Sequence, residues 1–233
     1  MAYSSVYLVV DQLPQQGTIN PELSSKWIGA FKDTYQDCPV QVVTAEDWAS
    51  IVNNNQGNIA PDILVCPLML QLPDTLPFSG QSVYEKCGHL DMIREQVRTQ
   101  WGYEFGNGHQ WLPIVLTAKG PLYGEVIGCS PVMTNATQQT IPSYQQPIHL
   151  SDQWRQPVYR LGYSLLTDLG ATPGVYLLQF ALENDVLLFD RLWPFPYYPA
   201  LASVGVQSPN LFECHWRCLT EQPILDLTIV PQS

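Results

Sequence analysis

The sequence predicts an α/β protein whose two halves differ in architecture. Three short apolar runs in the first third, residues 6–10, 40–43 and 62–70, are separated by segments in which apolar residues recur at helical spacing. Apolar strands that alternate with helices are typical of a parallel sheet covered on both faces. The second half contains paired β-rich runs instead, which predict antiparallel hairpins and an α+β arrangement.

Residues 1–100 are interpreted as a small Rossmann-like unit. Its helices are expected at residues 24–35 and 84–101, where apolar side chains recur at helical spacing, and at 45–52, which Thr44 caps. The glycine-rich fingerprint of dinucleotide sites is absent after the first strand, where the turn contains Gly17 alone. This unit is therefore predicted to be a scaffold.

Residues 101–233 are expected to form a second unit. Two β-rich runs around the turn at Gly120 and Pro121 predict an antiparallel hairpin over 111–132, followed by a polar loop with the run PSYQQP. A helix is expected over residues 151–170, where apolar side chains share one face and a glycine ends the pattern.

A second hairpin is expected from strands at 174–182 and 185–190. Its second strand ends at Asp190, which the loop RLWPFPYYP follows directly. A last helix is predicted at 210–219 and a closing strand at 223–230. Chain order thus places an acidic residue and an aromatic loop at the end of this hairpin.

Charge and composition exclude several classes of protein. The chain has 10 basic and 21 acidic residues, a net charge of −11 and no basic stripe, which argues against general nucleic-acid binding. No apolar run approaches the roughly 20 residues that a membrane-spanning helix needs. The opening run MAYSSVYLVVDQLP lacks the cationic start of a signal peptide, so a cytoplasmic protein is expected.

The six cysteines show no CxxC pair and no regular spacing, so reduced thiols are expected. Cys214, His215 and Cys218 lie close enough on the last predicted helix to suggest a metal site. A closed zinc site needs about four ligands, however, and no second cluster is visible. We therefore predict no metal.

The second hairpin brings Gln179 and Asp190 onto neighbouring strands. Side chains on one face of such strands lie within about 5 Å of each other. Two carboxylates in these positions would hold a Mg²⁺ ion that bridges nucleotide phosphates. Here one of the two positions is an amide.

Three runs in the second half form a recognisable pattern: GVYLLQFAL, DVLLFDRLWPFPYY and FECHWRC. Over roughly residues 110–222 this pattern resembles the C-terminal half of ATP-grasp enzymes, above all carboxyaminoimidazole ribonucleotide synthetase, a carboxylate–amine ligase family of the purine pathway. Several residues match the family's motif: Pro194, Pro196, Phe212, Glu213, His215 and Arg217. The Rossmann-like first unit agrees with the family's domain order, and the resemblance also implies a homodimer.

The departures from the family concern its magnesium and phosphate ligands. Gln179 stands where the family has its first metal-binding glutamate, Asp190 keeps the charge of the second, and Phe195 replaces an arginine that contacts substrate or phosphate. These changes remove a charge at the ion and a bidentate phosphate clamp. Gln179, Asp190, Trp193 and Phe195 are therefore predicted to be a vestigial metal and nucleotide site.

The family's ATP lid is also expected to be missing. A lid needs roughly 50 to 100 residues, whereas only about 40 separate the third strand from the hairpin at residue 111. The run GYEFGNG at 102–108 is interpreted as a flexible turn rather than a phosphate loop. The resemblance therefore implies a degenerate, lid-less ATP-grasp relative.

Other readings of these residues stay open. Asp190 could be an ordinary solvated residue at a strand end, and Glu213 with Arg217 could simply stabilise their helix as an i, i+4 pair. The aromatic side chains of the loop could form a partner surface or could fill a vacated cleft: Trp193, Phe195, Tyr197 and Tyr198. The candidate partner surface comprises Trp193, Tyr197 and Tyr198.

The predicted function is that of a non-catalytic ATP-grasp-like protein, a protein-binding or assembly module without a cofactor. One alternative is an ATP-dependent carboxylate–amine ligase with ATP, Mg²⁺ and a rearranged metal site, in which Glu125 and Asp168 join Asp190. A second alternative is a nucleotide or small-molecule sensor that uses the old cleft without turnover.

Overall fold

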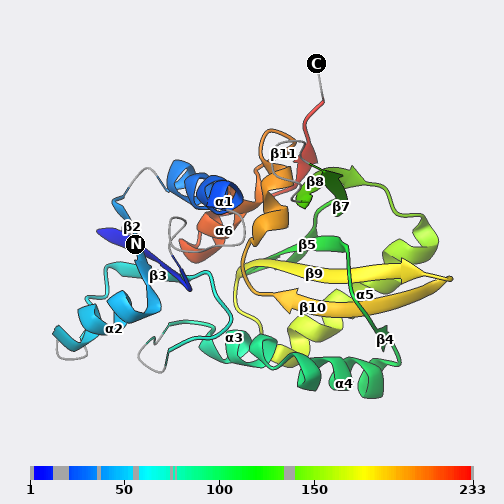
Figure 1. Cartoon of the computed structure of the whole chain (residues 1–233), viewed down its shortest axis with the longest axis horizontal. Helices are drawn as coiled ribbons and strands as arrows, with labels where there is room; N and C mark the ends of the chain where they lie inside the picture. The colour runs from blue at the N-terminus through cyan, green and yellow to red at the C-terminus, as the bar shows by residue number, and fades with distance from the viewer. Residues whose placement is uncertain are drawn as a thin grey trace.

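The computed structural model describes residues 3–12, 21–35, 38–54, 58–73, 76, 78–133 and 140–231. They form a mixed α/β fold with a three-stranded parallel sheet, a seven-stranded, mainly antiparallel sheet and a two-stranded sheet, which confirms the predicted fold class (Figure 1). Helices α1 and α6 lie between the two sheets in this view. No helix within the described part of the chain is long and apolar enough to cross a membrane.

The first sheet is parallel and has the strand order β2-β1-β3. Its strands are short and apolar: β1 (Ser5–Val10), β2 (Val40–Thr44) and β3 (Ile63–Pro67). Successive side chains of β1 point to opposite faces, so Leu8 packs with α1 (Pro21–Thr34) while Val9 packs with α2 (Ala45–Asn54). The predicted alternation of strands and helices is confirmed here.

The helix predicted over residues 84–101 is two helices, α3 (Gln81–Gly88) and α4 (Leu90–Trp101). The helical conformation is interrupted at His89, whose φ and ψ are −89° and 70°. At Gly88 a Cβ atom would lie 3.2 Å from the carbonyl oxygen of Leu70, so the break also brings the backbone close to the loop after β3. The uninterrupted apolar spacing concealed this break.

The second sheet has the order β4-β10-β9-β5-β7-β8, and β6 pairs with β5. Its strands up to the long helix are β4 (Glu104–Phe105), β5 (Gln110–Thr117), β6 (Gly120–Tyr123), β7 (Val126–Met133) and β8 (Thr140–Ile148). The predicted hairpin is present as β5 and β6. The predicted polar loop is wrong, because the run PSYQQP belongs to β8, an edge strand, where proline is tolerated.

Helix α5 (Asp152–Leu169) packs on one face of this sheet and ends at Gly170, as predicted. The second hairpin consists of β9 (Gly174–Glu183) and β10 (Val186–Trp193), joined through Asn184 and Asp185. These two turn residues have φ values of 50° and 59°, the left-handed conformation that two-residue hairpin turns require.

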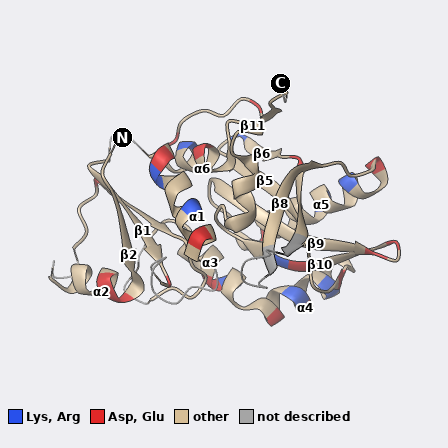
Figure 2. Cartoon of the chain, turned by 45° about the horizontal axis from the view of Figure 1, so that its top comes forward, with Lys and Arg blue, Asp and Glu red and all other residues tan. Residues whose placement is uncertain are grey.

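Helix α6 (Leu211–Leu219) and the 3-10 helix η1 (Tyr198–Ser203) cover the other face. The predicted closing strand shrinks to β12 (Thr228–Ile229), which pairs with β11 (Gln207–Ser208). One apolar cluster runs from Leu8 of the first sheet through α1 and α6 to Val175 of the second. The domain boundary near residue 100 stays a prediction. Figure 2 shows charged residues on helices α1, α2 and α4 and at the tip of the β9–β10 hairpin.

Among the described residues, the chain between β3 and β5 forms only α3, α4 and the two-residue β4. The absence of an ATP lid stays a prediction.

Candidate functional site

The β9–β10 hairpin carries the two residues predicted to be vestigial metal ligands. The strand register shifts by one residue between Phe189 and Arg191, so that Arg191 lies opposite Gln179 and Asp190 is the extra residue of a bulge. In a β-bulge, the side chain of the extra residue does not follow the alternation of side chains between the two faces of the sheet. Here the carboxylate of Asp190 points inward, and the residue is only 4% exposed.

Protein groups engage both carboxylate oxygens of Asp190. Arg94 of α4 donates from Nη2 to Oδ1 at 2.6 Å, and its Nε donates to the Asp190 carbonyl oxygen at 3.0 Å. The backbone N–H of Gly108 donates to Oδ2 at 2.8 Å, and Arg191 lies 3.4 Å from Oδ1. The interpretation of Asp190 as an ordinary solvated residue is therefore wrong.

The side-chain amide of Gln179 is used at both ends. Its Nε2 donates to the carbonyl oxygen of Gly108 at 2.7 Å, and its Oε1 accepts from the indole N–H of Trp193 at 2.9 Å. An ionised glutamate has no donor for that carbonyl group. The amide is thus the side chain that fits this position, whereas a carboxylate would face the Gly108 oxygen unfavourably.

Residues 104–109, which we call the strap, cross the hairpin at this point. β4 pairs in parallel with β10, the N–H of Gly106 donates to Phe189 at 2.9 Å, and the N–H of His109 donates to Phe180 at 3.1 Å. At Gly108 a Cβ atom would lie 2.7 Å from the backbone nitrogen of Phe180. The interpretation of 102–108 as a flexible turn is therefore wrong, because backbone hydrogen bonds hold the strap on both strands.

The aromatic loop after β10 faces the first unit. Phe195 is 1% exposed, and its ring stacks on Tyr84 at a centroid distance of 5.8 Å. The indole N–H of Trp27 on α1 donates to the carbonyl oxygen of Pro196 at 2.7 Å. Phe195 therefore packs between the aromatic loop and α3, at the position where the resemblance places an arginine that contacts substrate or phosphate.

The residues predicted as a partner surface are half-buried. Trp193 stacks on Tyr197 at a centroid distance of 4.0 Å, and the Cζ atom of Arg191 lies 5.3 Å from the centroid of the Trp193 ring. The hydroxyl group of Tyr198 is hydrogen-bonded to Ser24 of α1 at 2.8 Å. These side chains contact one another and the first unit, and their role as a partner surface stays a prediction.

The cysteine and histidine residues of α6 are part of the protein core. His215 is buried, which lowers its pKa to about 3 and keeps the ring neutral. Its Nδ1 accepts from the N–H of Val175 at 3.1 Å, so the proton is on Nε2, 3.6 Å from the sulfur of Cys66. Burial raises the pKa of the Cys66 thiol to about 12. No group of three or more potential metal ligands occurs among the described residues.

Glu213 caps the start of α6 rather than pairing with Arg217. Asn210 and Glu213 form a capping box, in which the carboxylate of Glu213 accepts from the N–H of Asn210 at 3.0 Å. The sequence had indicated a structural role for this glutamate, and the capping box identifies which one.

The other candidate acids bind elsewhere. Glu125 lies 3.7 Å from His149, and Asp168 at the end of α5 accepts a hydrogen bond from Gln96. Neither is among the contacts of Asp190. Sequence reasoning missed the two groups that matter most at the site, Arg94 and Gly108.

Comparisons with known proteins give a consistent picture. No protein-family model matches the chain. It is 27% identical over 165 residues to a formate-dependent phosphoribosylglycinamide formyltransferase from Synechococcus sp. (strain CC9902), covering 66% of this chain and 41% of the relative. The same enzyme of Flavobacterium psychrophilum is 28% identical over 102 residues, covering 43% of this chain and 26% of the relative. The chain thus matches less than half the length of these relatives.

Solved structures share the fold at low sequence identity. Glycinamide-RNase-transformylase T from Mycobacterium tuberculosis aligns with a TM-score of 0.67 and 14% identity, covering 97% of this chain and 82% of that one. N5-carboxyaminoimidazole synthetase from Staphylococcus aureus, solved with ADP, aligns with a TM-score of 0.62 and 9% identity, covering 98% and 81%. These likenesses confirm the fold that the resemblance had implied.

Proposed function

We propose that this chain, a relative of the ATP-grasp carboxylate–amine ligases, acts as a non-catalytic protein-binding or assembly module. The proposal rests on the strap. The N–H of Gly108 donates to the carboxylate of Asp190, and its carbonyl oxygen accepts from the side-chain amide of Gln179. In the family that this chain resembles, the residues at these two positions bind a magnesium ion. In this chain they are hydrogen-bonded to Gly108 instead.

Electrostatics at the hairpin also disfavour a magnesium ion. Mg²⁺ prefers one or two carboxylates together with phosphate oxygens. Here the single carboxylate of Asp190 lies beside the guanidinium groups of Arg94 and Arg191. A divalent cation would therefore meet one negative and two positive charges.

Freeing Asp190 for a metal would be costly. Its ion pair with Arg94 is largely buried, with 6% and 17% of the respective side chains exposed. Breaking a buried pair typically costs about 3 to 5 kcal/mol, because the remaining charge is left uncompensated. A bound ion would have to exceed that cost and also displace the strap.

The test is calorimetric titration with Mg-ATP, combined with an assay for ADP release in the presence of formate or bicarbonate. We expect no magnesium-dependent binding and no ADP, with the Synechococcus formyltransferase as the positive control. The variant Gln179→Glu should stay inactive as well, because the Asp190–Arg94 pair remains and still occupies the carboxylate of Asp190. ADP release that disappears in Asp190→Asn would instead establish the ligase alternative.

The cellular setting belongs to the same proposal. No disulfide links any of the six cysteines, all of which lie within the described residues, and this supports a reducing compartment such as the cytoplasm. The proposed partner is another protein. A homodimer stays a prediction from the resemblance, which light scattering on the purified chain would check.

A further inference from the structure

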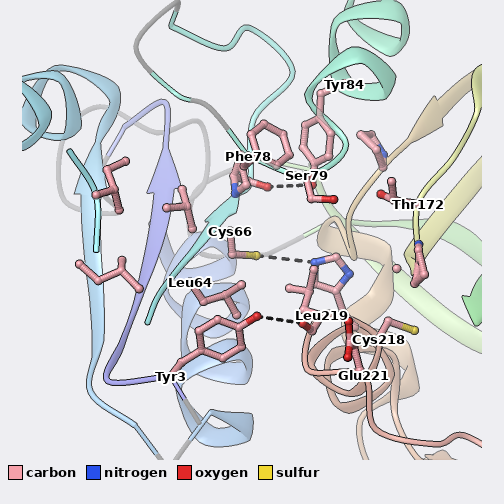
Figure 3. A pocket seen from close by; sticks show the side chains of 18 of the residues that line it. Tyr3, Leu64, Cys66, Phe78, Ser79, Tyr84, Thr172, Cys218, Leu219 and Glu221 are labelled. Atoms are coloured by element: carbon pink, nitrogen blue, oxygen red, sulfur yellow. Dashed lines mark hydrogen bonds between the residues drawn. The ribbon is translucent and has the colours of Figure 1, made fainter. Parts of the chain in front are cut away.

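A groove separates β3 from the second unit. It has a volume of about 660 Å³ and lies between β3 on one side and the end of α6 on the other (Figure 3). Two hydrogen bonds connect its walls, from the hydroxyl group of Tyr3 to the carbonyl oxygen of Leu219 at 3.5 Å and between Cys66 and His215 at 3.6 Å. The groove is distinct from the β9–β10 site.

The groove runs along the open edge of β3. All residues of this strand, Ile63 to Pro67, line it. Side chains of a strand alternate between the two faces, so consecutive residues can line one cavity only where it follows the strand's edge. Both faces of β3 are covered, since Cys66 packs in the α1 cluster and Val65 in the α2 cluster. Among the described strands, β3 has β1 as its only neighbour.

The backbone groups that face the groove follow from the register. The N–H of Leu68 donates to Val9 of β1, and the carbonyl oxygen of Asp62 accepts from Ser4, each at 2.8 Å. In a parallel ladder alternate residues bond to the same neighbour. Leu64 and Cys66 therefore also face β1, while the backbone groups of the intervening residues point into the groove.

Two of these outward groups already have partners, because the hydroxyl group of Tyr84 donates to the Pro67 carbonyl oxygen and the Ile63 N–H donates to Ala60. Within the described part of the chain, the carbonyl oxygen of Ile63 and both backbone groups of Val65 have no hydrogen-bond partner. They form one donor and two acceptors at strand spacing, the pattern that an added strand would pair with.

The chemistry of the walls restricts the occupant further. Apolar side chains such as Ile59, Leu64 and Leu219 line the groove, and Glu221 is the one charged side chain among its lining residues. The whole chain carries a net charge of −11. A complementary ligand is therefore apolar, extended and positively charged. A strand added beside β3 is a single extended segment, which a flexible peptide supplies.

We propose that this groove binds an extended peptide segment of another protein as a fourth strand beside β3, with a Lys or Arg side chain at Glu221. Peptides that extend a sheet in this way gain affinity from backbone hydrogen bonds and specificity from alternate side chains. The inference specifies the partner class of the binding module proposed above and rests on that proposed function.

The test uses seven synthetic heptapeptides of alternating Val and Thr, each with a single Lys at a different position. Binding is followed by the hydrogen exchange of the Val65 amide, which is expected to slow when a peptide adds as a strand. Failure of all seven peptides to protect Val65 overturns the proposal. This failure leaves the Mg-ATP titration unaffected, so the two proposals are separable.

Two N-methylated forms of the best peptide separate strand addition from simple apolar binding. One carries methyl groups on the odd-numbered amides and the other on the even-numbered amides. Only alternate amides of an added strand face β3, so one form should bind about tenfold more weakly while the other binds like the parent. Equal effects of both forms would contradict the proposal.

The charge requirement has a matched pair of variants. Glu221→Gln should weaken binding of the best peptide about two- to fivefold. Glu183→Gln, an exposed carboxylate at the tip of the β9–β10 hairpin, should leave binding unchanged. Equal affinities for the two variants would show that Glu221 does not recognise the basic residue, and that part of the proposal would be wrong.

Discussion

The two sheets differ at the places where a ligand could bind. In the second sheet, the corner between β9 and β10 is closed, because Gln179 and Asp190 are hydrogen-bonded to Gly108 and Asp190 is paired with Arg94. In the first sheet, the outer edge of β3 is open beside a groove. Buried polar groups in proteins are almost always paired. In this molecule, unpaired backbone groups at the edge of β3 are a better indication of a ligand site than the family motif in β9 and β10.

The largest expected effect tests the closed corner. Asp190→Ala removes the acceptor of both Arg94 and the Gly108 N–H, so we expect a loss of about 3 to 5 kcal/mol in the free energy of unfolding. Urea denaturation measures it. Asp33→Ala, at an exposed position of α1, is the matched control and should change stability by no more than about 0.5 kcal/mol. Similar losses for both variants would mean that the corner is not closed by Asp190.

The fit of the strap gives the next effect. Gly108→Ala would place a methyl group 2.7 Å from the backbone nitrogen of Phe180, which should destabilise the fold by about 1 to 3 kcal/mol. Gly29→Ala is the matched control, because nothing lies within 4 Å of its Cβ position in α1 and alanine favours a helix. A Gly108→Ala variant as stable as the wild type would show that the strap does not pack closely against the hairpin.

The stability of the protein should depend on pH through His215, which lies beside the groove. Burial holds the pKa of His215 at about 3, below the value of about 6.5 expected in the unfolded chain. The neutral ring therefore contributes stability that is present above pH 6.5 and is lost as the pH falls toward 3. From pH 6.5 to 5 the loss should be about 1 to 2 kcal/mol.

The variant His215→Asn provides the comparison for this pH dependence. Asparagine can accept the hydrogen bond from the N–H of Val175 but does not titrate in this range. Its denaturation profile should lack the His215 contribution. Parallel profiles for the variant and the wild type would contradict the assignment of a buried neutral imidazole.

The smallest expected effect concerns the contact between the units. Trp27→Phe keeps an aromatic ring at this position of α1 but removes the indole N–H that donates to Pro196. We expect a loss of about 1 kcal/mol, the usual contribution of one hydrogen bond. An unchanged midpoint in urea would show that packing alone holds α1 against the aromatic loop.

Local patterns predicted much of the fold. The β9–β10 hairpin, the helix that ends at Gly170 and the parallel first sheet all follow from apolar periodicity and turn residues. The strand β8 was missed because its prolines favour a loop, and only its place at the edge of the sheet makes them acceptable. The break at His89 depends on a close approach of the backbone to Leu70, which no sequence pattern reveals.

The candidate site was predictable only in part. The resemblance identified Gln179 and Asp190, but it gave no information about what they contact. Arg94 lies 96 residues before Asp190 in sequence, and the strap joins the hairpin through backbone atoms that any residue possesses. The glycine at position 108 was the available signal, since a close approach of two backbones requires a residue without a Cβ atom.

We propose that the strap occupies the position at which the resemblance places a magnesium ion. Hydrogen exchange of the Gly108 amide tests it most directly, because this N–H donates to the Asp190 carboxylate that a metal would need. We expect slow exchange that is unchanged by saturating Mg-ATP. Rapid exchange, or protection that Mg-ATP abolishes, would contradict the claim and restore the hairpin as a nucleotide site.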